Sequence, residues 1–471
     1  MINWFDHILF HTRNQPETPA MVMEDRVITY GMLGLGVDRC AQRIAALDIS
    51  RDGAVAVIVA NPIRHMVLCL ALFRLGLRSL SLTHSQQSQS IPGMILTLGD
   101  REASQPRAQV HFRHRVIEVT ENWFAEDAPA RELPPGFATA AEICRLSLTS
   151  GTTGAPKILQ YTVADMGGKG VSLLLGSSAS RRLCLPGLAS ALGFWTASAV
   201  LTGGGTLYFS ESPFQSIRMI ELFAIEHVMA PTEHLLALTR VARVLKAHLP
   251  SLHSIETGGT MPSRALLEAA IIYVCRDIYC RYGASEAGPM ARAPARNVLA
   301  RPGLVGHVLP GVEIEIVDPS GKPCAPGAVG LVRSRHDPRW DGSDAAWLDL
   351  GDLGWLTENN ELFVVGRASD PDTAKGEAAR KISPVHEAEH LVRLEWDSVD
   401  AAAVTIEKSG ARSQLVVATI GCDDAKADVL EAILRARGFD YEVRIVPVQA
   451  IPRGVSGKVN RAELKALLMR A

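Results

Sequence analysis

The sequence is poor in the features that mark several classes of protein. Its eight cysteines are scattered, with no C-x-x-C pair and no metal-ligand spacing, so they indicate small buried hydrophobic residues in a reducing compartment. The apolar runs at 54–60 and 66–72 are far shorter than the roughly 20 residues that span a bilayer. The first residues lack the basic and apolar regions of a signal peptide. We therefore expect a cytoplasmic protein with no membrane span.

Neither positive nor negative charge dominates the chain. Its 48 lysines and arginines nearly balance 50 aspartates and glutamates, for a net charge of −2. There is thus no electrostatic reason to expect nucleic acid or an anionic membrane as a partner. With 47% apolar and 21% charged residues the composition is that of a globular protein, and 471 residues are too many for one ordinary core. Two or three domains are expected.

Hydrophobic periodicity changes along the chain. Strands and helices alternate before residue 84, with strands expected at 27–30 and 54–60 and a helix at 62–75. They alternate again between 146 and 290, and both regions predict a parallel sheet covered by helices. The segment 312–317 alternates apolar and polar residues and precedes a turn, as in an antiparallel sheet with one wet face. The last hundred residues alternate once more, with a helix expected near 384–393 and strands near 398–406 and 414–420.

These patterns predict an α/β protein with two domains joined by a hinge. The N-terminal domain, residues 1–367, would combine helix-covered, mostly parallel sheets with a β-rich subdomain. A linker-like stretch follows Arg367. Residues 368–471 would form a small, mobile C-terminal α+β domain.

The stretch from Leu146 to Lys157 is the most informative part of the sequence. It combines hydroxyl residues with glycines that let backbone N–H groups approach an anion, and it ends in a lysine suited to phosphate. Its candidate phosphate-binding residues are Thr149, Ser150, Gly151, Thr152, Thr153, Gly154 and Lys157. The order differs from a Walker A loop, and 34–39 lacks the third glycine of a Rossmann fingerprint. The alternative is a polar surface loop rich in small residues.

Further motifs follow in order. They are Thr257-Gly258-Gly259-Thr260, Tyr282-Gly283-Ala284-Ser285-Glu286, Asp349-Leu350-Gly351-Asp352, Gly366-Arg367, and the segment from Pro452 to Arg461 that contains Lys458. Gly283–Ala287 lacks the last glycine of a nucleophile elbow. Alone, each motif also fits a turn or a solvated loop, but the ordered set is specific.

In this order and spacing, the chain resembles the adenylate-forming superfamily of acyl- and aryl-CoA ligases, carrier-protein adenylation domains and luciferases. The resemblance extends from Val27 to Lys465. It implies that a carboxylic acid and ATP give acyl-AMP and pyrophosphate, with Mg²⁺, and that CoA then takes the acyl group. A carboxylate attacking a phosphate brings two anions together, so neutralisation and positioning are the main catalytic tasks.

The resemblance also implies the roles of single residues. Lys458 would bridge the carboxylate and the α-phosphate, Ser285 would donate to that phosphate, and Glu286 would bind Mg²⁺. Tyr282, next to Gly283, would lie against adenine, near Gly258 and Gly259. Asp352 would accept hydrogen bonds from the ribose hydroxyls, and Arg367 would also contact the nucleotide. Ser369 and Asp370 would lie at the hinge.

Two departures from the family pattern affect the substrate and the acceptor. The histidine of the family's H-x-x-G segment is Ser190 here, and small residues would line a roomy, largely apolar acyl pocket: Ala189, Ser190, Gly193 and Thr260. Such a pocket would suit an aryl or medium-to-long acyl group. Amino-acid activators of the family usually place an aspartate after the histidine motif, and no acidic residue lies between Arg182 and Ser210, so an amino acid is not the expected substrate. The hinge segment 371–381 is longer than usual, and His386 replaces a glutamate that shifts to Glu387.

Two alternatives to the CoA ligase remain open. One keeps adenylation but transfers the acyl group to a carrier-protein thiol or an amine. The other is a nucleotide-binding regulator without catalysis, although Lys157, Glu286 and Lys458 are all present. The expected partners of the enzyme are a small-molecule carboxylic acid and either CoA or a carrier protein, and the chain would act as a monomer or a homodimer.

Overall fold

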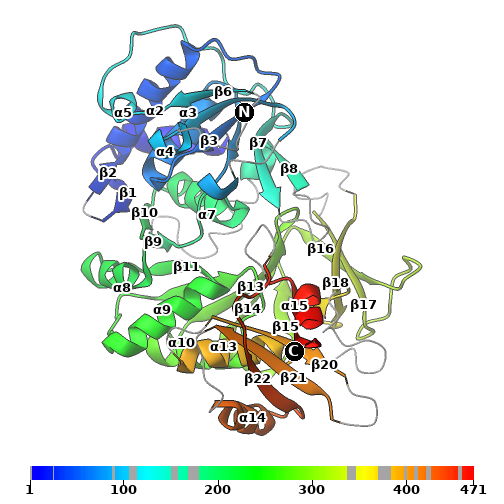
Figure 1. The fold of residues 1–471 in the computed structure, drawn as a ribbon. Coiled ribbons are helices and arrows are strands. Elements are labelled where there is room, and N and C mark those ends of the chain that lie inside the picture. Colours follow the sequence, from blue (N-terminus) through cyan, green and yellow to red (C-terminus); the bar gives the residue numbers. More distant parts are fainter. Residues whose placement is uncertain are drawn as a thin grey trace. The chain divides into compact units, whose positions relative to one another are not determined.

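The computed structural model of the protein describes most of the chain (Figure 1). The described residues are 3–24, 26–86, 91–104, 114–149, 157–167, 180–336, 346–369, 383–396, 400–407, 412–420, 426–453 and 459–470. They form two compact units, the first ending at Met229 and the second beginning at Ala230. The boundary expected near residue 367 lies inside the second unit and stays a prediction. None of the described helices is long and apolar enough to cross a membrane.

The first unit contains a largely parallel sheet in the order β6-β5-β3-β4-β7-β8, of which only β8 runs antiparallel. Its strands are β3 (Ala54–Ile58), β4 (Arg78–Ser81), β5 (Met94–Gly99), β6 (Arg115–Glu118), β7 (Ile143–Thr149) and β8 (Lys157–Thr162). All five residues of β3 are buried, as the continuous apolar run predicted. Short helical segments lie between these strands: η1 (His84–Gln86), α4 (Arg101–Ser104) and α5 (Asn122–Ala125).

A second set of strands in this unit pairs β11, β9, β10 and β1 in parallel, with β2 antiparallel at the edge. The strands are β1 (Pro19–Met23), β2 (Arg26–Thr29), β9 (Arg181–Cys184), β10 (Thr206–Phe209) and β11 (His227–Pro231). The helices are α1 (Trp4–Asn14), α2 (Tyr30–Ala45), α3 (Pro62–Arg74), α7 (Ala191–Thr202) and α8 (Pro213–Leu222). Helices α1, α2, α3 and α7 all contribute to one large apolar core. Tyr30, expected in a strand, begins α2 because Thr29 caps that helix.

The second unit begins with α9 (Thr232–Leu245) and a sheet in which β12 and β13 are parallel and the following pairs are antiparallel. Its strands are β12 (Ser254–Gly258), β13 (Ile278–Ala284), β14 (Gly288–Pro294), β15 (Leu304–Val308), β16 (Val312–Val317), β17 (Gly330–His336), β18 (Leu348–Leu356) and β19 (Glu361–Arg367). Helices α10 (Arg264–Tyr273) and α11 (Ala295–Ala300) precede β13 and β15. The change to antiparallel pairing confirms the β-rich region predicted after residue 300.

The last described residues form a small sheet in the order β20-β21-β22. Its elements are α13 (Val385–Glu395), β20 (Asp400–Ile406), β21 (Gln414–Ile420), α14 (Ala427–Ala436), β22 (Glu442–Pro447) and α15 (Arg461–Leu468). This α+β region agrees with the predicted helix and strands to within two residues at most ends. Helix α13 contacts both β20 and α10, so it touches the small sheet and the preceding helices together.

Candidate active site

Two strands of the second unit bring Tyr282 and Asp352 into contact. The phenol Oη of Tyr282, on β13, donates to Oδ2 of Asp352, on β18, at 2.5 Å. Arg367, at the end of β19, is the register partner of Asp352 and places its Nε 2.9 Å from Oδ1. The register of β18 and β19 pairs Asp352 with Arg367, and a hydrogen bond from β13 adds Tyr282, 70 positions from Asp352 in sequence. Three of the predicted nucleotide residues therefore meet at the Asp352 carboxylate.

Burial and a neighbouring charge keep the Tyr282 phenol a hydrogen-bond donor. Asp352 is 8% exposed, while the Arg367 side chain is half exposed and also donates from Nη1 to the Leu350 carbonyl at 2.6 Å. Burial, and then the negative charge of Asp352, raise the pKa of Tyr282 well above its usual value. Tyr282 therefore stays protonated as a donor, and Asp352 has acceptor capacity left for a diol.

A glycine turn follows β12, where the predicted adenine-side residues lie. A Cβ at Gly258 would lie 2.7 Å from the Arg281 carbonyl oxygen, so the two strands can approach only because this residue is glycine. Gly259 has φ +90°, which other residues rarely adopt. The hydroxyl of Thr232 donates to the Thr260 carbonyl at 2.8 Å and fixes the end of the turn.

Below this turn lies a charged cluster that the sequence motifs did not reveal. Glu256, 3% exposed on β12, accepts from Arg281 Nε at 2.5 Å and from Arg292 Nη2 at 2.6 Å. The Arg292 guanidinium also lies 3.6 Å from the centroid of the Tyr279 ring. One carboxylate thus ties β12, β13 and β14 together beside Tyr282. Its members come from non-contiguous positions outside the recognised motifs, so no local signal pointed to them.

The predicted metal and phosphate residues follow β13. Ser285 and Glu286 come directly after the last residue of that strand, and both are partly exposed. A Cβ at Gly283 would meet the Gly288 carbonyl oxygen at 2.4 Å, which explains the glycine in this motif. A carboxylate at the surface of a tight β13–β14 turn is a suitable ligand for a hydrated divalent cation.

The predicted phosphate loop connects β7 to β8 in the first unit. Thr149, the last residue of β7, pairs with Lys157, the exposed first residue of β8. The loop therefore closes a hairpin whose two ends are adjacent. Residues 150–156 lie outside the described part of the chain, among them the predicted Ser150, Gly151, Thr152, Thr153 and Gly154.

β7 is also anchored by a buried arginine that the motifs did not indicate. Arg145 is 3% exposed, and its Nη2 donates to Ser81 Oγ at 2.8 Å and to the Leu188 carbonyl at 3.2 Å. Its guanidinium lies 3.2 Å from the centroid of the Phe194 ring. The strand that enters the phosphate loop is thereby fixed to the start of α7.

The predicted acyl-pocket residues near α7 have clear local roles. Ser190 is exposed and caps α7, accepting from the Gly193 N–H at 3.1 Å and donating to the Gly187 carbonyl at 2.7 Å. A Cβ at Gly193 would lie 2.2 Å from the Gly187 carbonyl oxygen, so close packing requires glycine there. Ala189 is partly buried in the turn before the cap. Their contact with an acyl group stays a prediction.

The remaining predicted residues lie near or beyond gaps in the description. Ser369 follows β19 and is described, while Asp370 lies outside the described residues. Lys458 also lies outside them, although residues on both sides of its segment, up to Arg453 and from Val459, are described.

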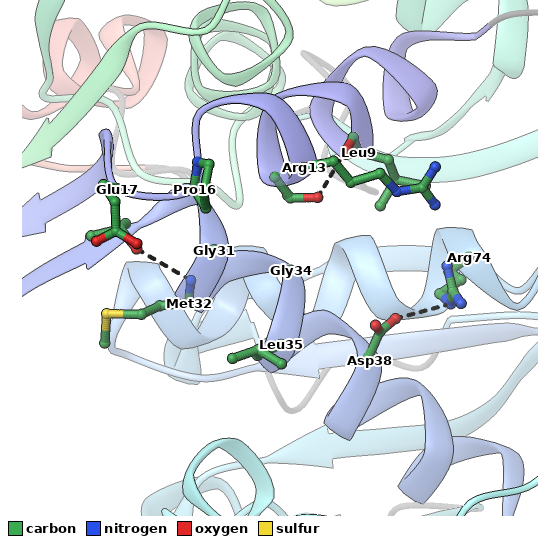
Figure 2. Close-up of a pocket in the computed structure, with 12 residues that line it drawn as sticks. Leu9, Arg13, Pro16, Glu17, Gly31, Met32, Gly34, Leu35, Asp38 and Arg74 are labelled. Atoms are coloured by element: carbon green, nitrogen blue, oxygen red, sulfur yellow. Dashed lines mark hydrogen bonds and ion pairs between the residues drawn. The ribbon is translucent and has the colours of Figure 1, made fainter.

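A separate groove in the first unit, of about 550 Å³, runs along α1 and α2 (Figure 2). An ion pair between Asp38 and Arg74, 3.3 Å apart, lies on one side, and Met32 and Leu35 are exposed on the other. No residue predicted for the nucleotide, the metal or the acyl group lines it. We therefore place the candidate active site elsewhere.

Comparison with known proteins identifies the class to which these motifs belong. The family model for AMP-binding enzymes matches residues 10–337 of the chain. The protein therefore belongs to the family of AMP-binding enzymes.

Particular relatives agree with this assignment over nearly the whole chain. A 2-succinylbenzoate–CoA ligase of Listeria monocytogenes is 26% identical, with 99% of both chains covered. The fatty acid–[acyl-carrier-protein] ligase ScoC of Streptomyces coeruleorubidus is 24% identical, over 97% of this chain and 94% of that one. Among solved structures, the o-succinylbenzoate CoA synthetase MenE of Bacillus subtilis, bound to its acyl-adenylate intermediate, aligns with a TM-score of 0.79 at 22% identity, over 99% of this chain and 98% of that one. The fold matches the predicted large α/β region and small C-terminal sheet domain.

Proposed function

We propose that the protein is an acyl-CoA ligase that activates a carboxylic acid as an acyl-adenylate, releases pyrophosphate and then transfers the acyl group to CoA. The observation that carries this proposal is that Tyr282 and Arg367 both contact the buried carboxylate of Asp352. A carboxylate held between a neutral donor and a cation, with lone pairs remaining, is suited to bind the two hydroxyls of a ribose. Family membership and the full-length match to a CoA ligase give independent support.

In the first step, the carboxylate of the acid attacks the α-phosphate of ATP and pyrophosphate leaves. Lys157 and Lys458 supply positive charge at the departing phosphates and at the reacting oxygens, and Ser285 donates to the α-phosphate. Glu286 would hold Mg²⁺, which supplies charge neutralisation for the phosphates when bound. Because positioning and charge do this work, no covalent enzyme intermediate is needed.

The second step transfers the acyl group to a thiol. The thiolate attacks the acyl carbon, and AMP leaves with the electron pair. We favour CoA because the 2-succinylbenzoate relative, a CoA ligase, matches both chains over 99% of their length. The carrier-protein ligase ScoC, which is nearly as similar, motivates transfer to a carrier-protein thiol as the second candidate. For the acid, the absence of an acidic residue between Arg182 and Ser210 favours an aryl or medium-to-long acyl group over an amino acid.

Pyrophosphate release measured across a panel of aromatic and aliphatic acids, with MgATP and with or without CoA, tests the proposal. We expect multiple turnovers with an aryl or medium-to-long acid only when CoA is present. Release that stops at one equivalent with CoA, but turns over with a carrier protein bearing a pantetheine thiol, would replace CoA by the second candidate. ATP binding without release for any acid would contradict adenylation.

A further inference from the structure

The segment that carries Lys458 begins and ends at one place in the small C-terminal sheet region. Arg453 and Val459 pair as an isolated antiparallel bridge, and the Asn460 N–H donates to the Pro452 carbonyl at 2.8 Å. Lys458 immediately precedes Val459 in the chain. Contacts that hold this bridge in place therefore also hold Val459, the residue next to the lysine.

One anchor of the bridge is a buried carboxylate on α13. Glu389, 6% exposed, receives Arg461 Nη1 at 2.8 Å on Oε1 and Nη2 at 3.2 Å on Oε2. The same Oε1 accepts from the Ala403 N–H at 2.8 Å, and Arg461 Nη1 also donates to the Ala403 carbonyl at 2.6 Å. A two-pronged contact of this kind fixes the direction of the guanidinium as well as its distance.

A second anchor lies at the other end of the segment. Nη2 of Arg453 lies 2.9 Å from Oδ1 and 2.7 Å from Oδ2 of Asp400, the first residue of β20. Asp400 is itself held by Nη2 of Arg393, on α13, at 3.1 Å. Arg393 reaches back to the Ala401 carbonyl at 3.0 Å. Both ends of the segment are thus attached to the same two elements, α13 and β20.

The contacts of Glu389 favour its charged form despite its burial. Burial by itself would raise the pKa of Glu389, but the hydrogen bond of His386 and the charge of Arg461 lower it well below its usual value. A buried ion pair is weak evidence for stability, because desolvation offsets its attraction, but it specifies geometry well. Arg461–Glu389 is such a pair, whereas Arg453–Asp400 is more open, with side chains 34% and 39% exposed. Together they fix the described chain on either side of the segment.

We propose that Glu389 and Asp400 are positioning residues that anchor the chain on either side of Lys458, through Arg461 and Arg453, and that this anchoring is required for adenylate formation. This inference rests on the proposed function, in which Lys458 acts on the carboxylate and the α-phosphate in the first step. It goes further by assigning the lysine's placement to two carboxylates on elements that are distant from it in sequence.

The test compares the two half-reactions in Glu389→Gln and Asp400→Asn. Pyrophosphate exchange reports adenylate formation, and CoA-dependent decay of a supplied acyl-AMP reports thioester formation. We expect adenylation to fall about 10- to 100-fold in each variant, because small misplacements of a reacting group have effects of this size. Thioester formation should stay within about twofold of the wild-type rate, since only the first step uses Lys458.

Matched variants separate this role from a structural one. Glu431→Gln removes a carboxylate that pairs with Arg412 and Arg435 in the same region but does not touch the Lys458 segment. It should leave both half-reactions unchanged. Asp400 is partly exposed, so its variant keeps the inference testable if Glu389→Gln does not fold.

Each outcome has a defined meaning. A loss confined to adenylation in folded variants supports the positioning role. Equal loss of both steps, or unchanged adenylation, overturns it. Lys458→Ala serves as the reference: if that variant still forms adenylate, the proposed function of the lysine is wrong, whereas loss in Lys458→Ala without loss in the two carboxylate variants contradicts only the inference.

Discussion

Helix α13 carries two buried glutamates, Glu387 and Glu389, on opposite faces, and their surroundings differ. Residues two apart on a helix point in nearly opposite directions. Glu389 faces β20 and α15 and has a two-pronged arginine partner. Glu387, 5% exposed, faces the N-terminus of α10, where both of its oxygens lie 3.2 Å from the Ala265 nitrogen.

The difference is in how well each charge is compensated. Arg437 Nη1 lies 2.6 Å from Glu387 but without hydrogen-bond geometry, and Arg437 also pairs with Glu268. Burial raises the pKa of Glu387 despite that cation, whereas the pKa of Glu389 is lowered. One carboxylate fastens the small sheet region internally, and the other joins that region to α10 through a weaker contact. The two glutamates are therefore equally buried, but only Glu389 has an arginine partner with good hydrogen-bond geometry.

The largest effect is expected from Glu389→Ala. The variant removes the buried carboxylate that accepts from both guanidinium nitrogens of Arg461 and from the Ala403 N–H. We expect the free energy of unfolding to fall by about 3–5 kcal/mol, as when one partner of a buried ion pair is removed. Urea denaturation followed by circular dichroism measures it, with Glu431→Ala as the control for a more exposed pair. A loss below about 1 kcal/mol would contradict the strong bonding of Glu389.

An intermediate effect is expected from pH. A raised folded-state pKa favours the folded protein at low pH, and that contribution is lost as pH rises through the folded value. A lowered folded-state pKa contributes stability above the usual glutamate pKa of about 4.3, and this is lost as pH falls. Relative to wild type, Glu387→Gln should therefore gain stability, and Glu389→Gln should lose stability, as pH rises.

The loss in Glu389→Gln should develop as pH rises to the usual glutamate pKa of about 4.3, and the gain in Glu387→Gln as pH rises above that value. Urea unfolding from pH 3 to 8 measures both trends. Parallel pH trends in the two variants would remove the distinction between the two glutamates.

The smallest effect is expected at a third buried carboxylate, Asp352, which in the proposed function must still accept hydrogen bonds from the ribose hydroxyls. Tyr282→Phe removes the phenol that donates to Asp352 at 2.5 Å but leaves Arg367 in place. We expect ATP affinity to weaken by about fivefold, equivalent to about 1 kcal/mol for one hydrogen bond. Isothermal titration calorimetry measures it, and thermal unfolding controls for stability. Unchanged affinity would show that the phenol does not prepare the carboxylate for a nucleotide.

Much of the fold could be predicted because local patterns decide it. The continuous apolar run of β3, the alternation in β16 and the helix α3 all lie where periodicity placed them. The predicted strand at 27–30 ends one residue too late, because Thr29 caps α2 and Tyr30 begins that helix.

The site was predictable only where motifs are local. Tyr282, Asp352 and Arg367 each belong to a short motif, and the strand register brings them together. Glu389 and Arg461 are 72 residues apart, and Glu256 and Arg292 are 36 apart, with no pattern linking either pair. Ser190 could have been recognised as a helix cap, because it precedes an apolar helical run.

The buried thiols offer a way to time the opening of each unit separately. Among the described cysteines, burial raises the pKa of Cys144 and Cys280 to about 12, so a thiol reagent reacts with them only after local or global unfolding. Four of the six buried thiols belong to the first unit and two to the second; they are Cys40, Cys69, Cys144, Cys184, Cys275 and Cys280. Mass spectrometry of pulse-labelled peptides thus measures the labelling rate of the cysteines in each unit within one experiment. No engineered probe is required, because both units already contain buried cysteines.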